Sequence, residues 1–112
     1  MNSKHQTVEP ITRQEFIEVT NDNGTTEVCE ALVRAVYFID DYDWLIEKLN
    51  QFLDHPNDNI KSVTVTCYGH LARLHKTANK NELLTILQPL LANQKLSGYA
   101  EDAIDDIEMF CP

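Results

Sequence analysis

The sequence predicts an all-α fold in one domain, built from five to six antiparallel helices. In six successive segments, apolar residues recur at steps of three and four, which is the spacing of the buried face of an amphipathic helix. Turn-forming residues separate these segments, and 112 residues suffice for one modest core. The segment from Ile60 to Leu74 shows the pattern best, because its apolar stripe exceeds normal strand length despite β-branched residues at positions 63–66.

The first three helices are expected over residues 12–20, 25–39 and 42–53. Thr12 and Glu15 have the spacing of a capping box at the start of the first helix. Residues 21–24 read Asn-Asp-Asn-Gly, and these residue types tolerate positive φ and break helices. The third helix should stop at His55-Pro56, because the residue before a proline is disfavoured in helical geometry.

The last three helices are expected over residues 59–76, 81–92 and 97–110. Pro89 lies inside the second of these and should kink it or shorten its first part, because proline cannot donate a backbone hydrogen bond. The polar residues before Pro10 lack periodicity, so that the first ten residues are expected to be flexible. The apolar faces of the six helices are expected to include Ile17, Leu74, Leu91, Tyr99 and Phe110.

The apolar pattern repeats along the chain. Residues 45–53 match residues 83–91 at an offset of 38, and residues 28–39 match residues 60–71 at an offset of 32. Residues 100–104 repeat the pattern of 64–68 at an offset of 36. Two-helix units of this length are typical of α-solenoids.

The segment from residue 56 to residue 72 resembles the first helix of a HEAT-type repeat. An Asp-containing turn leads to an apolar–basic pair, Ile60-Lys61, and then to a small residue, Thr64, and a small–large–Gly triplet at 67–69. The resemblance covers residues 25–110 and implies a short α-solenoid of stacked helical hairpins. A plain six-helix bundle with accidental periodicity is the alternative.

The charge is strongly and unevenly negative. Eighteen acidic and nine basic residues give a net charge of −9. The net charge is −8 over residues 1–58, +4 over residues 59–96 and −5 over residues 97–112. Such a field disfavours binding to nucleic acid or to an anionic membrane, and it suits a basic protein partner or simply keeps the chain soluble.

The sequence argues against an enzyme, a metal protein and a membrane protein. It contains no run of ~18 apolar residues, no apolar signal-peptide core and no Gly-rich phosphate loop, so a soluble cytoplasmic protein is expected. His70 and His75 are five residues apart, which places them on different faces of a helix. We therefore predict no catalytic residue, cofactor or metal site; a thiol enzyme that uses Cys67 is a weak alternative.

Two groups of acidic residues are the candidate partner-binding surface. The first lies between the second and third helices and interleaves carboxylates with aromatic side chains, a composition that suits an interface. The second lines the exposed side of the last helix, where like charges at helical spacing repel each other. The eight candidates are Asp40, Asp41, Asp43, Trp44, Glu101, Asp102, Asp105 and Asp106. A merely solvated surface is the alternative, and Trp44 could instead belong to the core.

A small, acidic, non-enzymatic helical domain resembles the immunity proteins that bacteria make against their own nuclease toxins, some of which have HEAT-like folds. The resemblance is one of class and matches no individual residue. It implies one-to-one binding to a basic toxin C-terminal domain, whose cleft would be covered by carboxylates in place of phosphates. Contact-dependent growth inhibition is the natural setting.

An adaptor module is the alternative function. A HEAT-like scaffold would bind a peptide or protein along its concave second helices, residues 44–53 and 83–92. Binding by such an adaptor should be weaker and less dependent on salt than binding by a toxin inhibitor.

Overall fold

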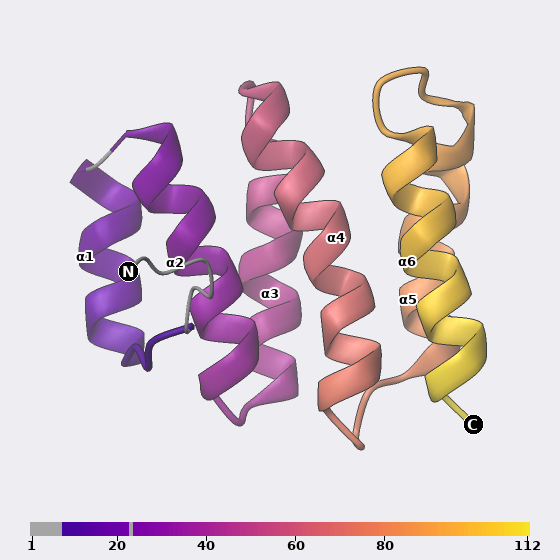
Figure 1. Ribbon diagram of the computed structural model, residues 1–112, viewed down its shortest axis with the longest axis horizontal. Helices are drawn as coiled ribbons and strands as arrows, with labels where there is room; N and C mark the ends of the chain where they lie inside the picture. The colour runs from indigo at the N-terminus through magenta and orange to yellow at the C-terminus, as the bar shows by residue number, and fades with distance from the viewer. Residues whose placement is uncertain (1–7, 23) are drawn as a thin grey trace, which may run out of the picture.

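The computed structural model describes residues 8–22 and 24–112, and this part of the chain is all-α, as predicted, without strands. Six α-helices and one 3-10 helix make up the described fold (Figure 1). Their bounds are α1 Arg13–Asp22, α2 Thr25–Phe38, α3 Tyr42–Leu53, α4 Asp58–Leu74, α5 Lys80–Leu87, η1 Gln88–Ala92 and α6 Ser97–Phe110. Five of the predicted helices agree with the observed bounds to within two residues at each end, whereas the predicted range 81–92 is divided between α5 and η1.

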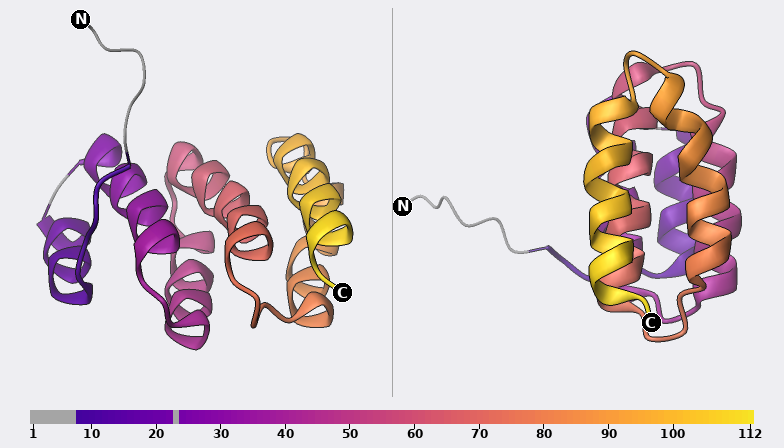
Figure 2. Two further views of the ribbon diagram at one scale, coloured as in Figure 1. Left: turned by 60° about the horizontal axis from the view of Figure 1, so that its bottom comes forward. Right: turned by 90° about the vertical axis from the view of Figure 1, so that its right-hand side faces the viewer.

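The helices form two layers. Helices α2, α4 and α6 run parallel to each other in one layer, α3 and α5 lie behind them, and α1 covers the outer side at the α2 end (Figures 1 and 2). Helix α4 is central, because it packs against α2, α3, α5 and α6. Within the described residues, α2 and α6 do not contact each other. The core therefore depends on α4 as the common partner of both layers.

Two sets of predicted repeat positions are buried in all three parallel helices. Successive α-helices pack most closely in the pairs α1–α2, α3–α4 and α5–α6. The repeat in the sequence begins with α2. Each repeat unit therefore combines the second helix of one pair with the first helix of the next pair. The buried residues at matching positions of α2, α4 and α6 are Leu32, Thr64 and Ala100, followed by Ala35, Cys67 and Ala103. This register supports stacked helical hairpins, while kinship with HEAT repeats stays a prediction.

Local side-chain chemistry explains where helices begin and end. The capping box before α1 is confirmed: the Glu15 amide donates to Thr12 Oγ1 at 3.1 Å, and the Thr12 amide donates to Glu15 Oε1 at 3.0 Å. The side chains of Asn57 and Asn79 cap the N-termini of α4 and α5, where each accepts a hydrogen bond from a backbone amide of the first turn. As predicted, Pro89 shortens the fifth helix: α5 ends at Leu87, and the chain continues as the 3-10 helix η1.

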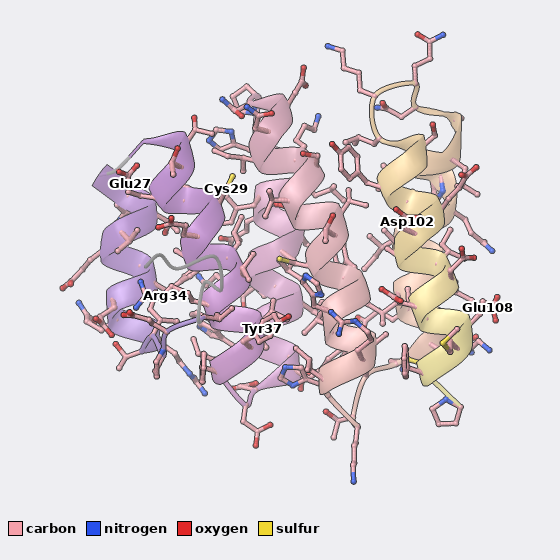
Figure 3. All side chains as sticks on the ribbon, in the orientation of Figure 1. Glu27, Cys29, Arg34, Tyr37, Asp102 and Glu108 are labelled. Atoms are coloured by element: carbon pink, nitrogen blue, oxygen red, sulfur yellow. The ribbon has the colours of Figure 1, made fainter. Side chains whose placement is uncertain are left out.

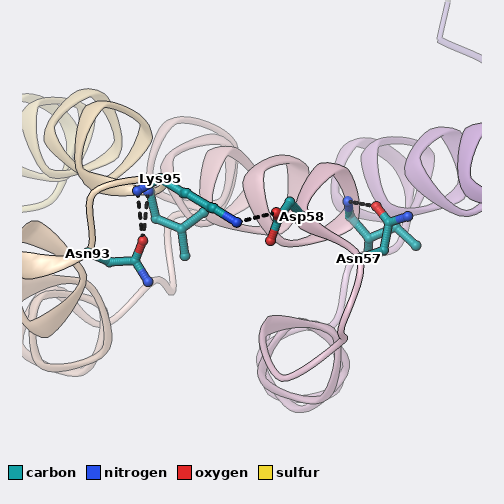
Figure 4. A network of polar contacts seen from close by, with 6 residues as sticks. Asn57, Asp58, Asn93 and Lys95 are labelled. Carbon is teal, nitrogen blue, oxygen red and sulfur yellow. Dashed lines mark hydrogen bonds and ion pairs between the residues drawn. The ribbon is translucent and has the colours of Figure 1, made fainter.

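Polar contacts connect the N-terminal ends of the three parallel helices. The Asn57 side chain donates to Thr25 Oγ1 at 3.2 Å, which connects α4 to α2. On the other side, Lys95 reaches from the loop before α6 to Asp58 in the first turn of α4, with Nζ and Oδ2 2.9 Å apart (Figure 4). Asn93 holds that loop by accepting from the amides of Lys95 and Leu96. These contacts therefore hold the N-terminal ends of α2, α4 and α6 together.

The first described residues lie against α2. The Arg34 guanidinium donates to the backbone carbonyls of Glu9 at 3.0 Å and Pro10 at 2.7 Å. Ile11 is buried in the core. Residues 8–10 are thus anchored by a side chain of α2, whereas residues 1–7, which share the prediction of flexibility, lie outside the described residues.

Some apolar side chains predicted to face inward are exposed instead. Tyr99 and Phe110 of α6 are 47% and 48% exposed, because among the described residues only α4, α5 and η1 pack against α6. The other apolar residues whose predicted burial is wrong are Ile17, Leu74 and Leu91.

Gly69 permits a close approach between α4 and α6. A Cβ atom at this position would lie 2.9 Å from Asp106 Oδ2 and 3.2 Å from the Cα atom of Ala103. The backbone of Ala103 can yield only if α6 moves away from α4. The glycine of the predicted small–large–Gly triplet thus has a steric role at the interface between α4 and α6.

Gly69→Ala should lower the free energy of unfolding by about 1–3 kcal/mol, because the added methyl group overpacks this interface. Gly98→Ala is the matched control: a Cβ atom at Gly98 meets nothing within 4 Å, and alanine favours the helix by up to about 1 kcal/mol. Denaturant unfolding followed by circular dichroism measures both. Equal stabilities for the two variants would contradict the steric role of Gly69.

Candidate partner-binding surface

The acidic residues between α2 and α3 differ in their contacts. Asp41 caps α3 by accepting from the Trp44 amide at 3.1 Å, and its carboxylate pairs with the Arg13 guanidinium of α1 at 2.6 Å. Asp40 and Asp43 are exposed, and neither forms an ion pair among the described residues. Asp41 therefore fixes the start of α3, whereas the exposed carboxylates of Asp40 and Asp43 are accessible to a partner.

Trp44 is half-buried and packs between α1 and α3. Its ring meets the ring of Phe16 edge-to-face, with centroids 5.4 Å apart. The cationic groups of Arg13 and Lys48 lie 5.5 Å and 5.6 Å from the Trp44 ring centroid. The contacts with Phe16 and Arg13 hold α1 against α3, whereas Lys48 lies on α3 itself, one turn after Trp44. The structure thus gives Trp44 a packing role, while its partner-binding role stays a proposal.

The acidic residues of α6 form the second group. Glu101, Asp102 and Asp105 are exposed and lack an ion pair within the part of the chain that the structure describes. Asp106 is partly buried, and its Oδ2 atom lies 3.8 Å from Arg73 Nε on α4. The three exposed carboxylates therefore leave this side of α6 strongly negative.

The structure does not bring the two acidic groups together. One group precedes and begins α3, and the other lies on α6 beyond α4 (Figure 1). Among the described residues, neither α2 nor α3 contacts α6. The eight predicted residues are therefore two separate patches.

Between these patches lies a polar and aromatic cluster that the sequence analysis did not single out. The rings of Tyr37 on α2 and His70 on α4 meet edge-to-face at 5.5 Å, and His70 Nδ1 contacts the Arg73 guanidinium. Burial lowers the pKa of His70, as does Arg73, while Asp106 opposes them. His70 is thus neutral at neutral pH. The exposure of Tyr37 could have been read from the sequence, because it lies off the apolar stripe of its helix.

Figure 3 shows Tyr37 and Asp102 on α2 and α6, with α4 between them. A shallow cleft of about 530 Å³ lies nearby, between residues 8–9, α2 and α4. Its lining is largely apolar and includes Cys29, Val33 and Val63. This side of the molecule combines aromatic, apolar and acidic side chains.

Cys67 and His75 are held in structural positions. Cys67 is fully buried, and burial raises the pKa of its thiol to about 12. His75 bonds through its ring to the Val36 carbonyl at 2.8 Å. Among the described residues, no group of three or more His, Cys, Asp or Glu side chains could hold a metal ion. The thiolate that a nucleophile requires is therefore scarce at Cys67.

Helices long and apolar enough to cross a membrane are absent from the described residues.

The chain resembles a solved structure over almost its entire length. No protein-family model matches it, and no curated protein matches it significantly. It is similar to a chain in the crystal structure of a CDI complex from Cupriavidus taiwanensis LMG 19424. The sequences are 26% identical, the TM-score is 0.88, and the match covers 97% of this chain and 96% of that chain.

Asp41→Ala should lower the free energy of unfolding by about 0.5–2 kcal/mol, because α3 loses its N-cap. The exposed ion pair with Arg13 adds little to this loss. Asp41→Asn retains an acceptor oxygen and should lose less, and Asp40→Ala is the exposed control. A thermal melt of the three variants orders them, and equal losses for Asp40→Ala and Asp41→Ala would refute the capping role.

Iodoacetamide at pH 8 should leave Cys67 unmodified in the folded protein and alkylate it rapidly in denaturant. The reason is that a thiol with a pKa of about 12 holds almost no thiolate at that pH, and the fold excludes the reagent. Peptide mass spectrometry locates the label, with half-buried Cys29 as the internal comparison. Native labelling of Cys67 as fast as in denaturant would restore the thiol-enzyme alternative.

Proposed function

We propose that this chain is the immunity protein of a bacterial contact-dependent growth inhibition system. Such systems pair a toxin with the protein that neutralises it. The observation that carries the proposal is the similarity of the whole chain to a component of a CDI complex at a TM-score of 0.88. The proposal includes a protein partner, because an immunity protein acts by binding its toxin.

The chemistry of the chain favours the inhibitor over the toxin. A toxin that cleaves nucleic acid must bind phosphates, and a net charge of −9 repels them. The described residues offer no candidate metal cluster, and Cys67 is buried. An inhibitor needs only a surface that fits its target, so the chain is proposed to be non-enzymatic and without a cofactor.

The proposed target is the basic C-terminal domain of a nuclease toxin, bound one-to-one in the cytoplasm. The carboxylates would occupy the cleft that otherwise binds phosphates. Opposite charges also accelerate association, as protection against an incoming toxin requires. Exposed residues proposed to contact the toxin are Asp40, Asp43, Glu101, Asp102 and Asp105, while Asp41, Trp44 and Asp106 would hold the two patches in place and border the interface.

The adaptor alternative has less support from the surface. Its predicted peptide site runs along α3, α5 and η1. Among the described residues, α3 and α5 carry no exposed large apolar side chain, and η1 carries only Leu91. A peptide bound there would lack the apolar anchors on which affinity usually depends.

Coexpression tests the proposal. The probe is the C-terminal domain of a large secreted protein encoded beside this gene, expressed in a bacterial host with and without this chain. Restored growth together with a one-to-one complex in size-exclusion chromatography is the expected result. A toxic domain that this chain neither binds nor neutralises would overturn the immunity function.

Replacing Asp41, Asp43, Asp102 and Asp105 by Asn should slow association with the toxin domain at low salt by about 10-fold or more, because long-range steering weakens. The dependence of the on-rate on ionic strength should also become shallower. Stopped-flow or biolayer measurements over a salt series give both quantities.

A matched control removes the same number of charges elsewhere. The exposed acidic residues Glu18, Glu27, Glu47 and Asp54, each changed to its amide, serve this purpose. If both quadruple variants associate equally fast, net charge alone controls the rate, and the two acidic patches are not the interface.

A further inference from the structure

Exposed apolar side chains are unevenly distributed between the two layers. Eight large apolar residues are exposed among those described, and six of them belong to α2, α4 and α6, the three helices of one layer. The six are Tyr37, Phe38, Leu74, Tyr99, Met109 and Phe110. We call the exposed side of these three helices the α2/α4/α6 face. Exposed apolar side chains that border charged residues suit a surface that binds a partner.

Helix α6 contributes most to this face. Within the part of the chain that the structure describes, it packs on α4, α5 and η1, and its opposite side has no partner. Asp102, Asp105 and Met109 follow each other at helical spacing along that outer side, and Met109 is 74% exposed. Tyr99 precedes Asp102 by one turn. Apolar and acidic side chains are therefore adjacent on one helix surface.

Three basic residues at or beside this face are already engaged. Arg34 donates to the carbonyls of Glu9 and Pro10, Arg73 contacts Asp106, and Lys95 pairs with Asp58. The α6 carboxylates Glu101, Asp102 and Asp105 have no ion pair among the described residues. The electrostatic potential over the α6 side of the face is therefore negative, which favours a basic partner.

We infer that the toxin domain docks on the α2/α4/α6 face, where Tyr37 and Tyr99 act as apolar anchors beside the carboxylates of α6. This inference rests on the proposed function and extends it to a particular surface and to residues outside the two acidic patches. The partner surface it requires presents Lys or Arg side chains beside an apolar patch. A second copy of this chain fits poorly, because it would bring α6 carboxylates against one another.

The aromatic and the acidic residues are expected to affect different rate constants of binding. Aromatic side chains near the centre of an interface dominate affinity and act mainly on dissociation, whereas charges act mainly on association. Trp44 is less suited as an anchor, because α1 and two cationic side chains already cover its ring. The tyrosines of the face are 39% and 47% exposed, so their truncation should spare the fold.

The test uses the same toxin C-terminal domain as its probe. The double variant Tyr37→Ala/Tyr99→Ala should bind it about 100-fold more weakly, mostly through faster dissociation, since each anchor is worth on the order of tenfold in affinity. Gln51→Ala/Gln88→Ala, on α3 and η1, is the matched control in the other layer and should bind within about twofold of wild type. Circular dichroism checks that both variants fold.

A footprint locates the surface without mutation. Hydroxyl-radical oxidation of Met109, Tyr37 and Tyr99 should fall several-fold in the complex, while oxidation of Ile17 on α1 and Leu91 on η1 should not change. These comparison residues are also exposed, at 40% and 43%. Protection of Leu91 with no protection of Met109 would move the interface to the other layer and overturn the inference.

The remaining outcomes separate the two proposals. If wild type neutralises the toxin domain and the tyrosine variant binds equally well, the docking face is wrong and the immunity function stands. If wild type does not bind the domain, both proposals fail. If the chain alone forms a dimer that the tyrosine substitutions dissociate, the face belongs to a second copy, and the inference is overturned.

Discussion

The close packing of α4 against its neighbours is the constraint on which the rest of the structure depends. Eight of its seventeen residues are buried, and Gly69 lets α6 approach within van der Waals contact. The β-branched residues from Val63 to Thr66 disfavour an isolated helix, but tertiary packing outweighs this preference. Buried Thr64 satisfies its hydroxyl by donating to the Ile60 carbonyl at 2.7 Å. Removing α4 would separate α2 from α6 entirely.

The position of α6 connects this packing to function. As the last helix, it buries Ala100, Ala103 and Ile107 against the core and leaves its outer side to solvent. The small residues at 100 and 103 let the helices approach closely. Any shift of α6 would therefore move its carboxylates and Tyr99 relative to Tyr37 on α2, so that packing at Gly69 and affinity for a partner are coupled through one helix.

The acidic surface has an energetic cost that a purely structural helix could avoid. Glu101 and Asp105 repel each other at i, i+4 spacing, which costs a few tenths of a kcal/mol. Asp106 and Glu108 pair with basic residues of neighbouring elements, whereas Glu101, Asp102 and Asp105 have no ion pair within the described fold. This pattern supports a surface whose charge is matched by a partner rather than by the chain itself.

The sequence by itself determined the features that depend on neighbours along the chain: the six helices, the capping box at Thr12, the break at Pro89 and the buried repeat positions. These follow from backbone geometry and helical periodicity, which act over a few residues. Only the tertiary structure decided that Trp44 packs under α1, that Tyr99 is exposed and that the acidic residues form two patches. Those outcomes depend on which helices become neighbours and on where the stack of helices ends, and local spacing carries neither kind of information.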